Sequence, residues 1–126
     1  MCDLSKNIYI ETLHVMSEVV GVAMLYVSDE TLRLIRVVSG GKIKMEDAVR
    51  DAMIEFVENG GGEVIEYPRG EARNRVKVDD DLWRLVNMIR VELGYKRQDD
   101  LLFDVILSYL IRRGMDSHCV EQLLNL

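Results

Sequence analysis

Cysteine and proline are scarce in this chain of 126 residues, which has two of the former and one of the latter. Cys2 and Cys119 lie near opposite ends of the sequence and form no CxxC pair. The sequence therefore predicts neither a disulfide framework nor a zinc module, because each needs paired cysteines at short or regular spacing. The expected setting is a reducing cytoplasm.

A long hydrophobic run is also missing. The most apolar stretch, Val19 to Val27, is preceded by Glu18 and is far shorter than the roughly 20 residues that span a bilayer. The first residues, "MCDLSKN", lack the basic and then apolar regions of a secretory signal. We therefore expect a soluble, cytoplasmic protein with no membrane partner.

Catalytic and cofactor-binding patterns are absent as well. No HExxH motif, Ser/His/Asp order or phosphate-binding glycine loop appears, and "NGGGE" (Asn59 to Glu63) follows a predicted helix rather than a strand. His118 and Cys119 are adjacent but have no further ligands nearby, and His14 is remote in sequence. We expect no metal, no cofactor and no enzyme activity.

Positive charge is scarce in the first half of the chain. The net charge is −6, and residues 1–66 carry 6 basic and 12 acidic side chains, whereas residues 67–126 carry 10 of each. Long-range attraction to a polyanion is therefore not expected, and contact with nucleic acid would have to come from local patches.

What the sequence does contain is an internal repeat. "VSDETLRLIRVV" (Val27 to Val38) matches "VDDDLWRLVNMI" (Val78 to Ile89) in its apolar and polar classes at an offset of 51. After a two-residue difference in the turn, Met45 to Val57 matches Gln98 to Leu110 at an offset of 53. A unit of about 40 residues is thus duplicated, which is a length that rarely forms a stable core alone.

Each unit begins with an alternating segment that predicts a short strand. Leu25 and Val27 in the first unit, and Val76 and Val78 in the second, would face the core. Two helices follow in each unit, with apolar residues at helical spacing and glycine near their ends. The fold class predicted is mainly α with short β-strands.

Helix caps and the C-terminal tail complete this prediction. Ser28 and Asp79 are suitable N-caps for the first helices, and Gly94 is a suitable C-terminal signal. A short terminal helix is expected to begin near Ser117, and Trp83 is expected to be partly buried. The predicted organisation is an N-terminal extension with a helical pattern at 1–21, units at 22–60 and 73–114, a glycine-rich linker at 61–72, and the C-terminal helix at 115–126.

The sequence "RVKVDDDLWRLVNMIRVELGYKRQDDLLFDVILSYLIRRG" (Arg75 to Gly114) resembles the ribbon-helix-helix family of DNA-binding regulators along its whole length, and Leu25 to Gly60 fits the same pattern with a shorter turn. Tandem members of that family include conjugation-relaxosome proteins and transcription regulators of crenarchaeal viruses. The resemblance implies a tandem ribbon-helix-helix fold and a transcriptional regulator that inserts a two-stranded ribbon into the major groove of double-stranded DNA.

Strand alternation, together with this resemblance, identifies the candidate base-reading residues. If Val76 and Val78 face the core, then Arg73, Arg75 and Lys77 face outward, and arginine and lysine suit guanine O6 and N7. On the first strand, the outward positions are Val22, Met24 and Tyr26. These side chains can contact thymine methyls, and Met24 and Tyr26 are the candidates for that contact; the alternative is burial against another chain or the N-terminal segment.

The resemblance also implies phosphate contacts at the turn before each second helix, where backbone amides and basic side chains hold the DNA backbone. Gln98 and Met45 stand where the family usually has serine or threonine. The candidate phosphate-binding residues are Tyr95, Lys96, Arg97 and Gln98 in the second unit, and Lys42 and Lys44 in the first.

The units can pair within one chain or between chains, and we expect a homo-oligomer, a dimer or larger. The alternative function is an antitoxin-like or relaxosome-like accessory protein, in which segments 1–20 and 115–126 bind a protein partner.

Overall fold

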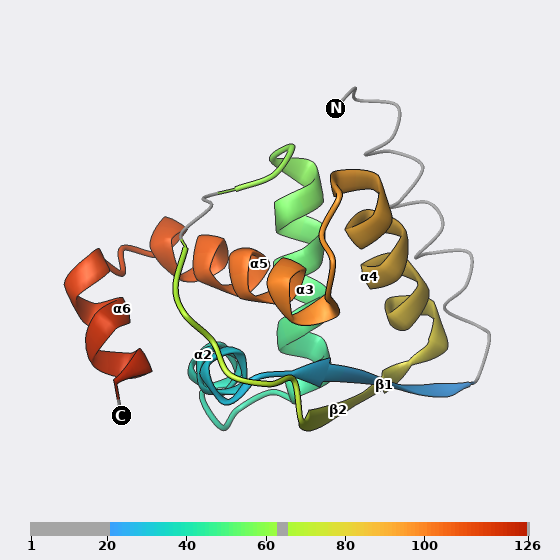
Figure 1. Cartoon of the computed structure of the whole chain (residues 1–126), viewed down its shortest axis with the longest axis horizontal. Helices are drawn as coiled ribbons and strands as arrows, with labels where there is room; N and C mark the ends of the chain where they lie inside the picture. Colours follow the sequence, from blue (N-terminus) through green and yellow to red (C-terminus); the bar gives the residue numbers. More distant parts are fainter. Residues whose placement is uncertain (1–20, 63–65, 126) are drawn as a thin grey trace.

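The computed structural model describes residues 21–62 and 66–125. Within them, two strands and five helices follow one another in the order of two strand-helix-helix units and a final helix (Figure 1). The N-terminal extension predicted at 1–21 lies, apart from Gly21, outside the described residues. The elements are β1 (Val22–Val27), α2 (Asp29–Ser39), α3 (Met45–Glu58), β2 (Asn74–Asp79), α4 (Asp80–Leu93), α5 (Gln98–Arg112) and α6 (Ser117–Leu124).

The two strands pair with each other in an antiparallel ribbon, so the pairing is made within one chain. Leu25 lies opposite Val76, and Val27 lies opposite Asn74. Leu25, Val27, Val76 and Val78 are all at most 1% exposed, which confirms the predicted alternation. One face of the ribbon therefore belongs to the core, because a shift of either strand by one residue would turn its two inward side chains to the outer face.

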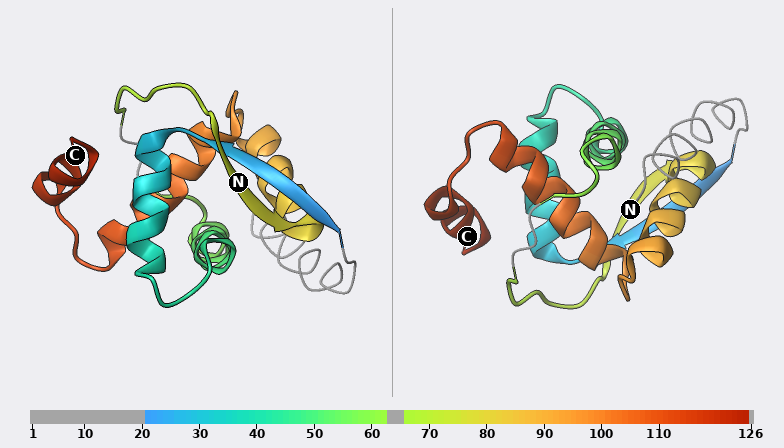
Figure 2. Two further views of the ribbon diagram at one scale, coloured as in Figure 1. Left: turned by 90° about the horizontal axis from the view of Figure 1, so that it is seen from below. Right: turned by 90° about the horizontal axis from the view of Figure 1, so that it is seen from above.

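Helices cover that inner face and leave the outer face uncovered by any described element. Figure 1 shows the ribbon along the lower edge of the molecule with the helices on one side of it. Seen from below, both strands lie in front of the helices (Figure 2). Elements from both units contact the strands, with α3 against β2 and α5 against β1.

Helix α5 is the centre of the core. Every residue from Leu101 to Ser108 is buried, which is unusual for a helix because most helices expose one face. The cause is that α2, α3, α4 and β1 all pack around it. The same crowding explains the position of Gly62, since a Cβ atom there would collide with Ser108 and press on Phe56.

The helix ends largely agree with the sequence. Ser28 caps α2 by accepting a hydrogen bond from the Thr31 amide, and Gly94 ends α4 with φ 78°. Helix α6 begins at Ser117 as predicted, and Asp116 is its N-cap, whose carboxylate accepts from the Cys119 amide at 2.9 Å. Among the described helices, none combines the length and apolar character needed to cross a membrane.

The segment predicted as a linker is packed against the helices where it is described. The Tyr67 ring stacks on Phe103 with 6.3 Å between centroids, and its hydroxyl donates to Asn125 Oδ1 at 2.9 Å. Farther along, the Gly70 amide donates to Glu30 Oε1 at 2.9 Å. This segment therefore joins α2, α5 and the residue after α6 as well as connecting the two units.

Candidate nucleic-acid interface

The outer face of the ribbon carries three pairs of side chains from the two strands, of which Val22 and Asp79 form the pair at one end. Met24 lies opposite Lys77, and Tyr26 lies opposite Arg75. Tyr26 is 46% exposed, Arg75 and Lys77 are exposed, and Met24 is half-buried. Residues directly opposite each other in a ribbon are close neighbours, so the four predicted base contacts on the paired strands form one continuous surface.

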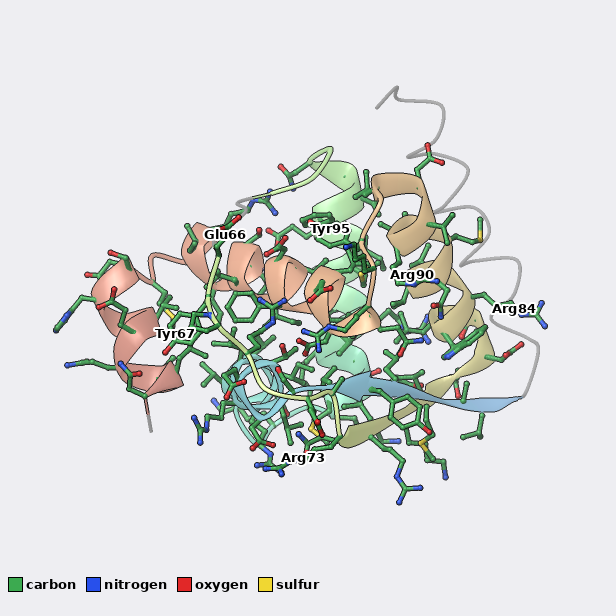
Figure 3. The ribbon with its side chains drawn as sticks, viewed as in Figure 1. Glu66, Tyr67, Arg73, Arg84, Arg90 and Tyr95 are labelled. Atoms are coloured by element: carbon green, nitrogen blue, oxygen red, sulfur yellow. The ribbon has the colours of Figure 1, made fainter. Side chains whose placement is uncertain are left out.

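Arg73 differs from the other two predicted basic contacts. It precedes β2, and its Nη2 lies 2.8 Å from Asp29 Oδ2 at the start of α2. Hydrogen bonds from Asn74 and then Arg73 hold the pKa of Asp29 below its usual value. Figure 3 shows Arg73 at the ribbon side of the molecule. Its charge is exposed but already has an anionic partner, unlike those of Arg75 and Lys77, for which no ion pair is found among the described residues.

The side chain of Gln98, a predicted phosphate contact, is used to attach α5 to the ribbon. Its Oε1 accepts from the Tyr26 amide at 3.0 Å, and its Nε2 donates to Asn87 Oδ1 at 3.3 Å. The amide group thus bridges β1 and α4. This fixes the N-terminus of α5 beside the strand that carries Tyr26.

A buried carboxylate strengthens the same attachment. Asp99 is fully buried and accepts from the Ser28 amide at 2.7 Å, from Ser28 Oγ at 2.9 Å and from Arg69 Nε at 2.9 Å. Arg69 also reaches Asp100 Oδ1 at 2.5 Å, and its guanidinium lies 4.4 Å from the centre of the Phe103 ring. Two cations therefore neutralise the start of α5: Arg69 from the segment between the units, and Arg97, whose Nη2 lies 3.6 Å from Asp99 Oδ2.

The first unit makes an equivalent attachment with different residues. Glu46, in the first turn of α3, accepts from the Asp79 amide at the end of β2. The repeat aligns Glu46 with Asp99 and Asp79 with Ser28. Each second helix is therefore tied through its first turn to the strand of the other unit, and both helix N-termini are held beside the ribbon.

The basic residues of the two turns divide into free and paired cations. Lys96 is exposed, as are Lys42 and Lys44, and none of the three makes an ion pair within 21–62 and 66–125. Arg97 donates to Asp100 Oδ1 through Nη2 at 3.1 Å. Burial alone would raise the pKa of Asp100, but hydrogen bonds from Arg97 and Arg69 outweigh it and hold that pKa below its usual value.

Lys44 and Lys77 line one groove beside the ribbon. Lys44 is the N-cap of α3 and makes no side-chain capping bond, while Lys77 stands on the outer face of β2. The groove brings a predicted phosphate contact and a predicted base contact together. Its lining residues are Val22, Lys44, Met45, Glu46, Val76, Lys77, Val78 and Asp79.

Tyr95, another predicted phosphate contact, directs its hydroxyl to the interior. The hydroxyl donates to Asp104 Oδ2 at 2.7 Å, and Figure 3 shows Tyr95 among the helices. Burial raises the pKa of Tyr95 and also that of Asp104, although the Tyr95 hydrogen bond and the charge of Arg69 oppose the shift of the carboxyl. This pair belongs to the support of the α4–α5 turn.

Replacing Asp104 with asparagine is expected to stabilise the protein at neutral pH. Because the pKa of Asp104 is raised in the folded state, the folded carboxyl binds its proton more tightly, and stability falls as the pH rises above about 4. Asparagine keeps an oxygen for the Tyr95 hydroxyl and has no charge to desolvate. We expect a higher urea midpoint for Asp104→Asn at pH 7, with the gain disappearing towards pH 4; an equal gain at both values would contradict the assignment.

No metal centre is found in the part of the chain that the structure describes, since no three histidine, cysteine or acidic side chains are grouped as ligands. Comparison of the chain with protein-family models, with curated proteins and with solved structures finds no match in any of the three.

Proposed function

We propose that the protein is a sequence-specific regulator of transcription that binds double-stranded DNA as a tandem ribbon-helix-helix protein, with the β1–β2 ribbon in the major groove. The observation that carries this proposal is the outer face of the ribbon. Arg75 and Lys77 are exposed there beside Tyr26, on a surface that no described element covers.

The shape and chemistry of this face fit the major groove. A two-stranded ribbon is narrow enough to enter the groove of about 12 Å, where each base pair presents a distinct set of donors and acceptors. Arg75 and Lys77 supply donors for guanine O6 and N7, and Met24 and Tyr26 supply apolar surface for thymine methyls. The core behind the ribbon, made by Leu25, Val76 and their neighbours, keeps these side chains on one face.

Lysines on both sides of the ribbon supply the phosphate contacts in this proposal. Lys42 and Lys44 lie in the turn before α3, and Lys96 lies in the turn before α5. Both turns are held beside the ribbon, by the Glu46 and Gln98 hydrogen bonds respectively. Because the whole chain is acidic, with a net charge of −6, these local contacts must overcome a general repulsion, and binding should weaken steeply with salt.

The proposal is tested by selecting bound sites from random double-stranded DNA with the full chain. The selected duplex is then titrated against a scrambled duplex at two salt concentrations. We expect a reproducible motif that binds at least about a thousandfold more tightly than scrambled DNA, as specific regulators do. Equal affinity for the two duplexes would refute the proposal.

Removing one lysine from a turn is expected to weaken binding without changing base preference. Lys96→Ala and Lys44→Ala should each reduce affinity for selected and scrambled DNA alike, and each should lower the slope of log affinity against log salt by about 1. Arg113→Ala is the matched control, because Arg113 pairs with Glu55 at the far end of α5. A lysine variant with an unchanged slope would remove that residue from the interface.

An accessory protein that binds a protein partner is the second candidate, and the outer face of α4 favours it. Met88 and Val91 are 38% and 67% exposed there, and Trp83 is half-buried beside them along one shallow hollow. Exposed apolar surface of this kind is typical of a protein contact. Failure of the DNA selection would direct attention to this face.

A further inference from the structure

The ribbon has a local two-fold axis that is defined by its register. The repeat offset of 51 maps Leu25 onto Val76, and these two residues are also direct partners in the ribbon. In an antiparallel pair, such an axis runs perpendicular to the sheet through the paired residues. It therefore leaves the molecule through the centre of the outer face, where a duplex lying along the ribbon would place its own local two-fold axis.

The side chains related by this axis are chemically unlike. Met24 corresponds to Arg75, and Tyr26 corresponds to Lys77. One member of each pair is a cation with several hydrogen-bond donors, and the other offers mainly apolar surface. If two identical chains formed the ribbon, these positions would carry the same residue, so the duplication within one chain is what allows them to differ.

The contacts that hold the first turns of α3 and α5 beside the ribbon also differ between the two units. At the α5 side, Asp99 is neutralised by Arg69 of the inter-unit segment at 2.9 Å and by Arg97 at 3.6 Å. At the α3 side, Glu46 bonds the Asp79 amide, and among the described residues no ion pair to Glu46 is found. The asymmetry thus extends from the outer side chains to the turns that would contact phosphates.

A palindromic duplex presents the same base edges at two-fold-related positions. A guanine that faces Arg75 would then recur at the two-fold-related position that faces Met24, and Met24 has no donor for guanine O6 and N7. A thymine that faces Met24 would likewise recur opposite Arg75, and the guanidinium would then lose its guanine acceptors. Buried polar groups left without a partner are costly, so each symmetric site satisfies only one half of the ribbon.

We infer that one chain recognises a non-palindromic element and binds it in a single orientation, with guanines below Arg75 and Lys77 and thymines at the two-fold-related positions below Met24 and Tyr26. This inference rests on the proposed function and adds the symmetry of its target. A dimer would recognise two copies of the asymmetric element, because each of its chains has its own ribbon.

The test uses the duplex selected by the full chain, shortened to the length that binds one chain by sedimentation. Two further duplexes are made, in which the left or the right half is duplicated about the centre. We expect each symmetric duplex to bind wild-type protein at least about tenfold more weakly than the selected one, because each mismatches two of the four residues Met24, Tyr26, Arg75 and Lys77. A symmetric duplex that binds one chain as tightly as the parent overturns the inference but leaves DNA recognition intact.

A protein variant with a symmetric outer face gives an independent test. The double variant Met24→Arg, Tyr26→Lys carries the same residues at two-fold-related positions, and its folding is checked by its thermal transition. In the same selection its preferred one-chain site should become palindromic. An unchanged, asymmetric site for a folded double variant would also overturn the inference, whereas a selection that yields no motif even for wild-type protein would refute the proposed function itself.

Discussion

Replacing Arg69 with methionine is expected to lower the free energy of unfolding by about 3 kcal/mol. Arg69 is only 12% exposed and pairs with Asp99, which is fully buried, and with Asp100. Methionine retains the packing of the aliphatic stem against Phe103 but leaves a buried carboxylate without its nearest cation, which typically costs about 3–5 kcal/mol. The Ser28 hydrogen bonds to Asp99 remain, and so does Arg97 at 3.6 Å, so we expect the lower end of that range in urea unfolding.

Two controls separate the buried charge from general damage. Arg113→Met removes another arginine that pairs with a carboxylate, Glu55, and lies over a ring, Tyr109. Its side chain is 48% exposed, so the loss should stay below about 1 kcal/mol. Adding Asp99→Asn to Arg69→Met should restore part of the lost stability, since an amide has no charge to neutralise. An equal loss for Arg69→Met and Arg113→Met would contradict the proposed importance of burial.

Arg75→Ala is expected to have the largest effect on DNA recognition. Its guanidinium stands on the exposed face of β2 opposite Tyr26, and a two-bond contact with guanine contributes about 1–3 kcal/mol of discrimination. We expect affinity for the selected duplex to fall by that amount while affinity for scrambled DNA falls much less. The measurement is a paired titration of both duplexes at one salt concentration.

Arg84→Ala is the matched control for Arg75→Ala. It removes the same charge from the exposed side of α4, where Arg84 pairs with Asp80 and points away from the ribbon (Figure 3). Its effect on both duplexes should be small and equal. Should Arg75→Ala weaken selected and scrambled DNA to the same extent, Arg75 would be a phosphate contact and base reading would have to come from elsewhere on the ribbon.

The elements were predictable from local pattern because the repeat constrains each of them twice. Alternation predicted the inward Leu25 and Val76, and Ser28 and Gly94 marked helix ends that the structure confirms. The partner of each strand was not predictable. Leu25 is equally suited to pair with Val76 of its own chain or of another, and the structure places the pair within one chain.

The contacts that hold α5 beside the ribbon could not be predicted from the sequence, for a different reason. Arg69 stands between Pro68 and Gly70, a composition that indicates a loop, and its partner Asp99 looked like an ordinary first-turn acid favoured by the helix dipole. The need for a cation arises only from the burial of Asp99, which is a tertiary effect. The amide of Gln98 is likewise engaged by a strand 72 residues away, so its local sequence carries no sign of that bond.

Pairing both strands within one chain also affects how the ribbon responds to dilution. A ribbon made by two chains forms in a concentration-dependent step, and its folded fraction falls as the protein becomes scarce. Here β1 and β2 are joined covalently, so each strand remains at a high effective concentration around the other. The unfolding midpoint of the ribbon should therefore not depend on subunit association, and a few molecules in a cell would keep the same binding surface as a concentrated solution.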